Sequence, residues 1–159
     1  MTDGFSNTKP ELGPLEEVKP ASLLTIPMED TRAHLAKISA EKRLDWAYEK
    51  FGKSFVMTTS FGIQSAVLLH MLHLLKNGDQ VPVIWVDTGY LPSETYSYAN
   101  QLNSQLGLNI QVAQSDISPA RMEALYGRLW ATGSEKDLEK YLLLRKVEPL
   151  EQKLNELKV

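Results

Sequence analysis

Apolar runs alternate with amphipathic stretches along most of the chain. Three short runs rich in β-branched and aromatic residues predict buried strands, at 55–59, 81–86 and 109–113. Apolar residues at helical spacing flank these runs, at 35–48, 66–75 and 93–106. Strands that alternate with helices pair in parallel. The pattern therefore predicts an α/β fold, with a parallel sheet between layers of helices.

Residues that start or stop helices punctuate this pattern. Gly52 and Gly107 follow helical stretches and are expected to end them. Ser118, which stands before a proline, predicts a short helix, and Ser134 is expected to cap another. Because proline interrupts helical hydrogen bonding, we expect a separate last helix that restarts at Pro149.

The N-terminal residues differ in composition from the rest. Four of the eight prolines fall within residues 1–27, so we expect an irregular arm there. Residues 28–159 are expected to form one α/β domain. Three strands make a small sheet, and the chain stops within or just after a helix. We therefore expect the front portion of a longer protein, with a complete small domain as the alternative.

Composition and charge restrict the chemistry. The 159 residues carry a formal charge of −3 and no cysteine. The absence of cysteine excludes disulfides, cysteine-ligated iron–sulfur or zinc sites and thiol catalysis by these residues. No basic excess points to nucleic acid or to an anionic membrane. No secretory signal is visible, and the longest apolar run, 66–75, is too short to span a bilayer. We expect a cytoplasmic protein.

The turn at 58–65 is the first candidate binding site. It joins a predicted buried strand to a helix, and it contains two hydroxyl donors, Ser60 and Ser65, around Gly62. Glycine permits backbone shapes that other residues resist, and N–H groups at a helix start suit a phosphate or sulfate oxyanion. An ordinary strand–helix turn is the alternative. The turn is not a Walker A loop, because no Gly-Lys-Ser/Thr follows.

The second candidate is the loop Asp87–Tyr90, which follows the next strand. In an open parallel sheet, ligands bind outside the carboxyl ends of the strands, so the two loops are expected to lie at one edge. A third candidate set is cationic: Arg128, Arg145 and Lys146 could neutralise a polyanion. The alternative is that these are solvated surface cations, with Arg145 in a local pair with Glu148.

Other notable side chains are expected to be structural. His70 and His73 have metal-compatible spacing, but no third ligand follows, so we expect packed histidines and no metal. Met71, Trp85 and Trp130 are expected to be packing residues.

Taken together, the motifs resemble the phosphoadenylyl-sulfate reductase family, which comprises thioredoxin-dependent enzymes of sulfate assimilation. The similar stretches follow the family's order and spacing over about residues 35–159. They are Thr59-Ser-Phe-Gly-Ile-Gln64, Val86-Asp-Thr-Gly-Tyr90 with Pro92, Glu94, Thr95 and Tyr96, Tyr126-Gly-Arg-Leu-Trp130, and Lys146-Val-Glu-Pro-Leu150. The resemblance implies a Rossmann-like parallel sheet of the adenine-nucleotide alpha-hydrolase-like type, here incomplete.

The resemblance also implies a set of substrate-binding residues. The family's modified phosphate loop corresponds to 60–65, and the loop after the second strand would line the nucleotide pocket. Lys146 would lie near the sulfate end. The residues implied are Ser60, Phe61, Gly62, Ile63, Gln64, Ser65, Asp87, Thr88, Gly89 and Lys146.

Family members reduce 3′-phosphoadenylyl sulfate to sulfite and adenosine 3′,5′-bisphosphate. A cysteine near their C-terminus attacks the sulfur, and thioredoxin then releases sulfite. A thiolate suits this reaction as a soft nucleophile. Because this chain has no cysteine, we expect it to carry only the nucleotide-binding part and to be inactive alone. Thioredoxin is the implied reductant of the full enzyme, and we expect a homodimer.

The resemblance leaves related chemistries open. Adenylyl-sulfate reductases hold an iron–sulfur cluster through paired cysteines, which would correspond to Tyr141 and Leu142 here. We therefore expect no cluster and no other cofactor, although Arg145 is similar to the cluster-containing group. A nucleotide-binding module without redox chemistry is another alternative. An ATP pyrophosphatase or sulfate adenylyltransferase subunit is disfavoured, because Phe61 and Gln64 replace the glycine and aspartate of its Ser-Gly-Gly-x-Asp-Ser loop.

Overall fold

A computed structural model describes residues 27–159. The predicted irregular arm at 1–27 therefore lies almost entirely outside the described residues. The chain divides into two compact units, with the boundary between Lys37 and Ile38. The first unit contributes one described helix, α1 (Met28–Lys37). The second unit contains all the remaining elements.

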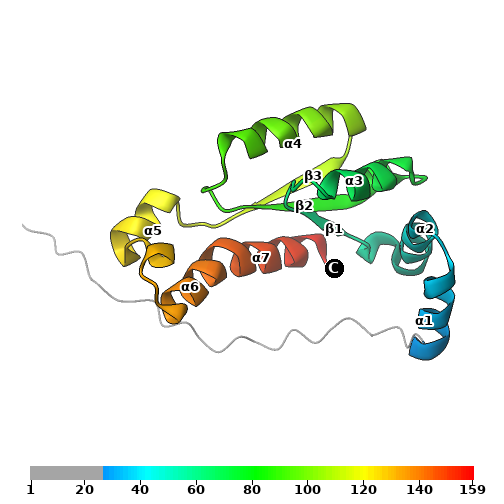
Figure 1. Cartoon of the computed structure of the whole chain (residues 1–159), viewed down its shortest axis with the longest axis horizontal. Coiled ribbons are helices and arrows are strands. Elements are labelled where there is room, and N and C mark those ends of the chain that lie inside the picture. The colour runs from blue at the N-terminus through cyan, green and yellow to red at the C-terminus, as the bar shows by residue number, and fades with distance from the viewer. Residues whose placement is uncertain (1–26) are drawn as a thin grey trace, which may run out of the picture. The chain divides into compact units, whose positions relative to one another are not determined.

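A parallel sheet of three strands lies at the centre of the second unit. Strands β1 (Met57–Thr59), β2 (Pro82–Asp87) and β3 (Asn109–Gln114) lie in the order β1-β2-β3, each parallel to the next. Helices α3 (Ser65–Leu74) and α4 (Ser93–Leu106) cover one face, and α7 (Glu148–Leu157) covers the other (Figure 1). The predicted α/β class and parallel sheet are confirmed.

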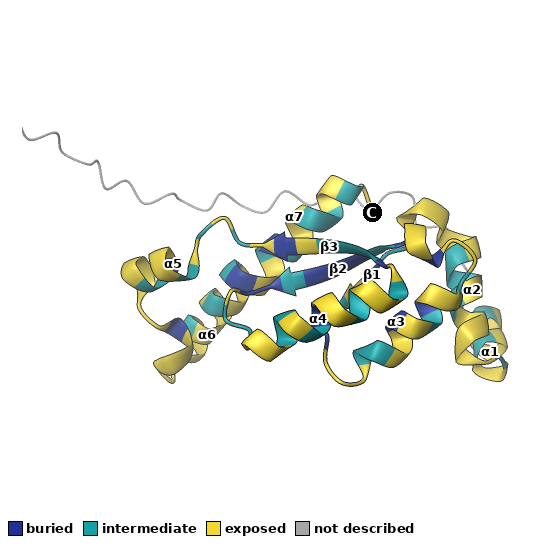
Figure 2. Ribbon diagram, turned by 90° about the horizontal axis from the view of Figure 1, so that it is seen from above, coloured by how far each residue is buried: buried dark blue, intermediate teal, exposed yellow. Residues whose placement is uncertain are grey.

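The core lies mainly between the sheet and the α3–α4 layer. Figure 2 shows β2 as the most continuously buried strand. Its alternate residues Val83 and Trp85 pack with Leu69 and Leu72 of α3 and with Ala99 of α4. Burial of both faces explains the unbroken apolar run of β2, since a strand covered on two sides has no polar face.

The helices near the N-terminus differ from the prediction. The continuous helix expected over 35–48 is interrupted, because α1 ends at Lys37 and α2 (Ala40–Phe51) begins three residues later. Ser39 is extended, and its hydroxyl accepts a hydrogen bond from the Lys42 N–H at 3.4 Å, as an N-cap does. Gly52 ends α2 as predicted and adopts a positive φ of 53°.

The C-terminal helices also differ from the prediction. Helix α5 (Pro119–Tyr126) starts after Ser118, and α6 (Glu135–Leu142) starts after Ser134, as expected. However, the backbone stays helical between the end of α6 and Pro149. A π-helical turn, η4 (Leu143–Val147), joins α6 to α7, and the Glu148 N–H donates to the Leu143 carbonyl. The wider turn changes the hydrogen-bond pattern ahead of Pro149, so the helical conformation continues past this proline.

Three short 3₁₀ segments complete the unit: η1 (Gly52–Ser54), η2 (Gly78–Gln80) and η3 (Leu129–Ala131). None of the helices within residues 27–159 combines the length and apolar character that crossing a bilayer requires.

Candidate functional site

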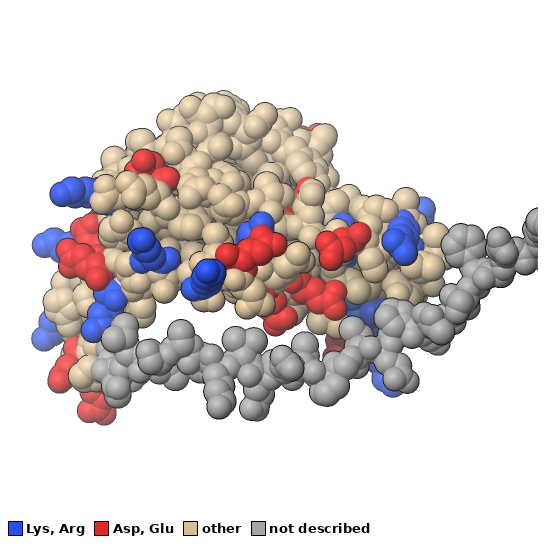
Figure 3. Space-filling view, turned by 180° about the vertical axis from the view of Figure 1, so that it is seen from behind, with Lys and Arg blue, Asp and Glu red and all other residues tan. Residues whose placement is uncertain are grey.

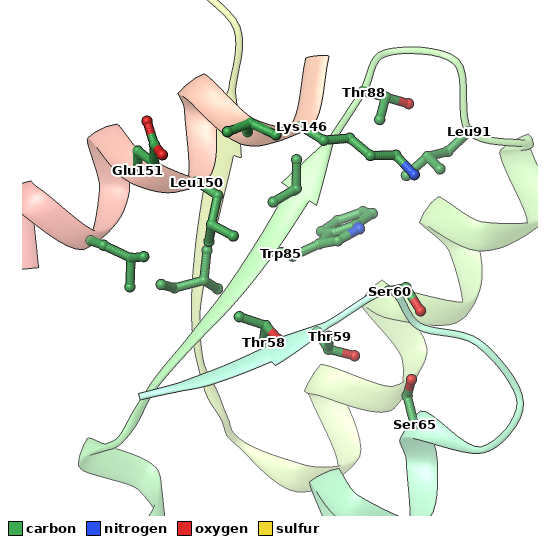
Figure 4. A pocket seen from close by; sticks show the side chains of 14 residues that line it. Thr58, Thr59, Ser60, Ser65, Trp85, Thr88, Leu91, Lys146, Leu150 and Glu151 are labelled. Carbon is green, nitrogen blue, oxygen red and sulfur yellow. The ribbon is translucent and has the colours of Figure 1, made fainter. Parts of the chain in front are cut away.

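A pocket of about 730 Å³ opens where β1 and β2 reach their carboxyl ends. This is the edge at which open parallel sheets bind ligands. Three segments line the pocket: the end of β1 with the following turn, the end of β2, and the π turn with α7 (Figure 4). The polar lining residues include Thr59, Ser60, Ser65, Thr88, Lys146 and Glu151. The two loops that the sequence singled out therefore share one pocket.

Two hydroxyl groups converge in the turn between β1 and α3. A Cβ placed on Gly62 would lie 3.5 Å from Ser60 Oγ and 4.0 Å from Ser65 Oγ. Figure 4 shows both serine side chains directed into the space enclosed by the turn. Ser65 begins α3, whose preceding residue Gln64 makes no side-chain cap bond. The first N–H groups of a helix and two nearby hydroxyls can hold an oxyanion.

The backbone of this turn differs from the expectation. The residue with left-handed conformation is Phe61, at a φ of 53°, and not Gly62. Buried Phe61 packs edge-on against Trp85, with ring centroids 4.9 Å apart, and its N–H donates to Thr59 Oγ1 at 3.1 Å. Packing and that hydrogen bond hold an uncommon conformation for a bulky residue. The missing side chain at Gly62 leaves space between the serines.

Not every residue of the implied phosphate loop lines the pocket. Ser60 and Ser65 do, whereas Phe61 is directed into the core. Ile63 is 94% exposed, and Gln64 is exposed at the start of α3.

The loop after β2 contributes Leu91 to the pocket lining, and of Asp87, Thr88 and Gly89 only Thr88 lines it. Asp87 is buried beneath it and accepts three hydrogen bonds. They come from the Tyr96 hydroxyl at 2.6 Å, the Gln114 side-chain amide at 2.7 Å and the Gly89 N–H at 2.8 Å. Burial by itself would raise the pKa of the Asp87 carboxyl, but these bonds and the Arg145 charge hold it below its ordinary value. Asp87 is therefore an ionised organiser of the loop.

Gly89 also has a structural role. Its φ is 74°, and a Cβ there would lie 2.6 Å from Cγ of Pro119 and 2.8 Å from Nη2 of Arg145. A side chain has no room at this position. Asp87, Thr88 and Gly89 were all expected to line the pocket. Only Thr88 does, and Asp87 and Gly89 instead support its position.

The π turn directs two consecutive cations differently. Arg145 is 2% exposed, and its Nε donates to the Thr88 carbonyl at 2.8 Å. Its two terminal nitrogens donate to the carbonyls of Thr88 and Ile117. The alternative that Arg145 is a solvated cation paired with Glu148 is wrong, because main-chain carbonyls of two other loops accept hydrogen bonds from its guanidinium. Arg145 does not line the pocket either, so it is not placed to neutralise a polyanion there. Lys146, the next residue, is exposed and lines the pocket.

Arg128 lies outside the pocket. Its side chain is 73% exposed, forms a 3.4 Å ion pair with Glu123 and does not line the pocket. Figure 3 shows acidic and basic side chains interspersed on the face that it draws, without a continuous basic patch. The positive charge available to a ligand in the pocket is thus that of Lys146.

His70, His73 and Trp130 were expected to be packed, but all three are exposed, although each contacts other residues. His73 Nδ1 lies 2.8 Å from the Leu106 carbonyl oxygen, and the His70 and His73 rings stack at 6.2 Å. Within residues 27–159, no group of three or more His, Asp or Glu side chains is placed to hold a metal. Trp130 packs edge-on against Tyr90 at 4.5 Å.

Sequence reasoning did not assign to the pocket three of its apolar lining residues, Trp85, Leu150 and Leu154. Trp85 lines it, although its position in an apolar strand suggested packing alone. Its place in the strand was the available signal, since Trp85 stands two residues before the carboxyl end of β2, the edge at which parallel sheets bind ligands. Leu150 and Leu154 of α7 form part of the opposite wall, and their spacing of four residues marks one helix face.

Comparison with known proteins identifies the family to which the chain belongs. The sequence profile of the phosphoadenosine phosphosulfate reductase domain matches residues 54–159, which include all three pocket-forming segments. The chain belongs to this family. The resemblance in the sequence motifs is thereby confirmed.

Curated relatives named phosphoadenosine 5′-phosphosulfate reductase agree with this assignment. The one from Synechococcus sp. is 52% identical over 128 residues, covering 80% of this chain and 54% of the relative. The one from Synechocystis sp. is 46% identical over 136 residues, covering 86% of this chain and 54% of the relative. The chain thus spans about half the length of the curated reductases that it matches.

A solved structure has the same fold. The crystal structure of phosphoadenylyl-sulfate (PAPS) reductase from Candida auris, a phosphate complex, aligns with a TM-score of 0.74 at 25% identity. The alignment covers 87% of this chain and 66% of that one. The predicted nucleotide-binding, Rossmann-like architecture is therefore that of the reductase family.

Proposed function

We propose that this chain forms the nucleotide-binding part of an enzyme that reduces 3′-phosphoadenylyl sulfate to sulfite and adenosine 3′,5′-bisphosphate. The observation that carries the proposal is the single pocket shared by Ser60, Ser65, Thr88 and Lys146. Hydroxyl donors, helix-start N–H groups and one ammonium suit the phosphate and sulfate oxygens of such a nucleotide. The apolar walls suit the flat face of a base.

The proposed reaction needs a thiol. A thiolate attacks the sulfur, the bond between sulfur and the bridging oxygen breaks, and adenosine 3′,5′-bisphosphate leaves with that electron pair. A dithiol such as that of thioredoxin then reduces the S-sulfonated cysteine, releases sulfite and becomes a disulfide. Since these 159 residues contain no cysteine, the attacking thiol must come from other polypeptide. The chain alone should therefore bind the nucleotide without releasing sulfite.

Arg145 does not favour the alternative substrate, adenylyl sulfate. Its guanidinium is committed to the carbonyls of Thr88 and Ile117 and does not line the pocket. The 3′-phosphorylated nucleotide stays the proposed substrate, with no iron–sulfur cluster, in a homodimeric cytoplasmic enzyme.

Titration calorimetry of the 159-residue chain tests the binding part of the proposal. We expect adenosine 3′,5′-bisphosphate to bind more tightly than adenosine 5′-monophosphate, and ATP with magnesium to bind more weakly than either. Removing both hydroxyls, with Ser60→Ala and Ser65→Ala together, should weaken binding at least about tenfold, since hydrogen bonds to charged groups contribute about 1.5–3 kcal/mol each.

Two further variants sharpen this test. Gly62→Ala places a methyl group between the serine hydroxyls without backbone strain, so it should weaken binding and leave the melting temperature near that of the wild type. Ser104→Ala removes an exposed hydroxyl on α4 that donates to the Asn100 carbonyl, and it should change affinity by less than about twofold. Equal affinity in all four proteins would remove the turn from the site. Failure of the wild type to bind any of these nucleotides would refute the proposed function.

A further inference from the structure

Trp85 is held rigidly at the inner wall of the pocket. Its side chain is 8% exposed and lies on β2, between Thr59 of β1 and Val112 of β3 in the strand register. Its ring packs against Phe61 at 4.9 Å and against Tyr96 at 5.6 Å between centroids. These contacts fix the plane of the indole, so the direction of its one polar group is also fixed.

That polar group has no partner. Within residues 27–159, the Trp85 indole nitrogen is the only buried side-chain nitrogen or oxygen that lacks a hydrogen bond. An unsatisfied buried donor destabilises a fold by about 1–3 kcal/mol, and native structures contain few of them. A phenylalanine would supply similar packing without this unfavourable term. The N–H therefore needs an explanation other than packing.

The surroundings of the indole supply one. Trp85 lines the same pocket as Ser60 and Lys146, and Figure 4 draws it between Lys146 on one side and Thr59 and Ser60 on the other. The Lys146 ammonium forms no hydrogen bond or ion pair with residues 27–159. Both groups are donors only, so neither can satisfy the other. An anionic oxygen is the group that both could bind.

We infer that the Trp85 indole N–H donates a hydrogen bond to an anionic phosphate or sulfate oxygen of the nucleotide, together with the Lys146 ammonium. This inference rests on the proposed function and adds a ligand-contacting residue that the family motifs do not include. The donor is covered by neighbouring side chains, so an acceptor reaches it when one of them moves. Lys146 lines the same pocket, and its exposed side chain is free to move with a ligand.

Trp85→Phe tests the inference by removing the donor and keeping an aromatic ring. We expect affinity for adenosine 3′,5′-bisphosphate or for adenylyl sulfate to fall at least about tenfold, as for a lost hydrogen bond to a charged acceptor. The melting temperature should be unchanged or higher, because an unsatisfied donor is removed. Trp46→Phe is the matched control, since Trp46 packs edge-on against Phe51 on α2 and does not line the pocket.

A spectroscopic measurement reports the same bond directly. The chain has three tryptophans, so the indole N–H region of a ¹⁵N-labelled sample should contain three resonances, which the two variants assign. Nucleotide should move the Trp85 indole proton downfield and slow its exchange with water, with little effect at Trp46. A shift with adenosine 3′,5′-bisphosphate assigns the acceptor to a phosphate, and a shift with adenylyl sulfate alone assigns it to the sulfate.

The outcomes separate the two proposals. If the wild type binds neither nucleotide, the proposed function fails, and the role of Trp85 fails with it. If the wild type binds but Trp85→Phe has affinity within about twofold for both nucleotides, the inference alone is wrong. An unmoved Trp85 indole resonance at saturation with both nucleotides would likewise make the residue a packing side chain only.

Discussion

The buried guanidinium of Arg145 offers the sharpest test of how the site is assembled. Arg145→Met keeps most of the apolar stem and removes all donors to two carbonyl oxygens, those of Thr88 and Ile117. Each orphaned buried acceptor destabilises a fold by about 1–3 kcal/mol. The contact between the guanidinium and the Tyr90 ring, 5.7 Å from carbon to centroid, is lost as well. We expect the free energy of unfolding to fall by about 3–5 kcal/mol.

Such a loss is large against total stabilities of about 5–15 kcal/mol. Urea unfolding followed by circular dichroism measures it, as a lower midpoint at an unchanged slope. A variant that is unfolded without urea would correspond to the upper end of the range. Arg145→Lys keeps the charge, but one ammonium cannot reproduce the forked geometry of the guanidinium. We therefore expect its free energy of unfolding to lie between those of the wild type and Arg145→Met.

Arg128→Met is the matched control, because it removes the same group from a side chain that is 73% exposed and makes one 3.4 Å ion pair. Surface pairs of this kind contribute little, so we expect a change below about 0.5 kcal/mol. If Arg145→Met destabilised the chain by less than about 1 kcal/mol, or no more than Arg128→Met does, the guanidinium would not be holding the two loops together.

Two further predictions concern the loop after β2. Gly89→Ala should destabilise the chain by at least about 2 kcal/mol more than Gly107→Ala in urea unfolding. Both residues have positive φ, but only a Cβ at Gly89 would meet atoms within 3 Å, on Pro119 and Arg145. Equal losses would refute the clash. For Asp87, whose pKa is lowered, the stabilisation by its carboxylate is present above the unfolded-state pKa of about 3.9 and is lost as pH falls through the folded-state value. The stability advantage of the wild type over Asp87→Asn should therefore shrink below about pH 4. Glu148, whose pKa is raised by burial, titrates in the wild type and in Asp87→Asn alike, so its effect cancels when the two stabilities are subtracted. A stability difference that did not change with pH would show that Asp87 is not the titrating group.

Much of the fold was predictable because local signals and tertiary structure agree. The strand runs stand where β1, β2 and β3 lie, and Gly107 ends α4 in the left-handed conformation that glycine favours. The interruption at Ser39 was missed, since apolar spacing continues across it and the N-cap serine looks like any polar surface residue. The predicted elements thus agreed best with the structure where burial and local backbone preference at the same residue favour the same conformation.

The site was predictable only in part, because its polar partners come from distant segments. Ser60 and Thr88 were expected at one sheet edge from the rule for parallel strands, and the pocket contains both. The burial of Arg145 depends on carbonyls 28 and 57 residues away in sequence. The unsatisfied nitrogen of Trp85 is likewise a property of three-dimensional packing. No pattern along the chain reports either one.

The π turn explains how neighbouring cations take different tasks. Successive residues of an α-helix are separated by about 100° around its axis, so two adjacent side chains seldom serve one loop together. Here the wider turn Leu143–Val147, followed by Pro149, places Arg145 against the Thr88 carbonyl and Lys146 beside the same loop in the pocket. The buried cation holds the end of β2 against the turn that presents the exposed cation. The position of Lys146 relative to Thr88 is therefore set by Arg145. A substitution of the buried Arg145 should weaken ligand binding by displacing Lys146.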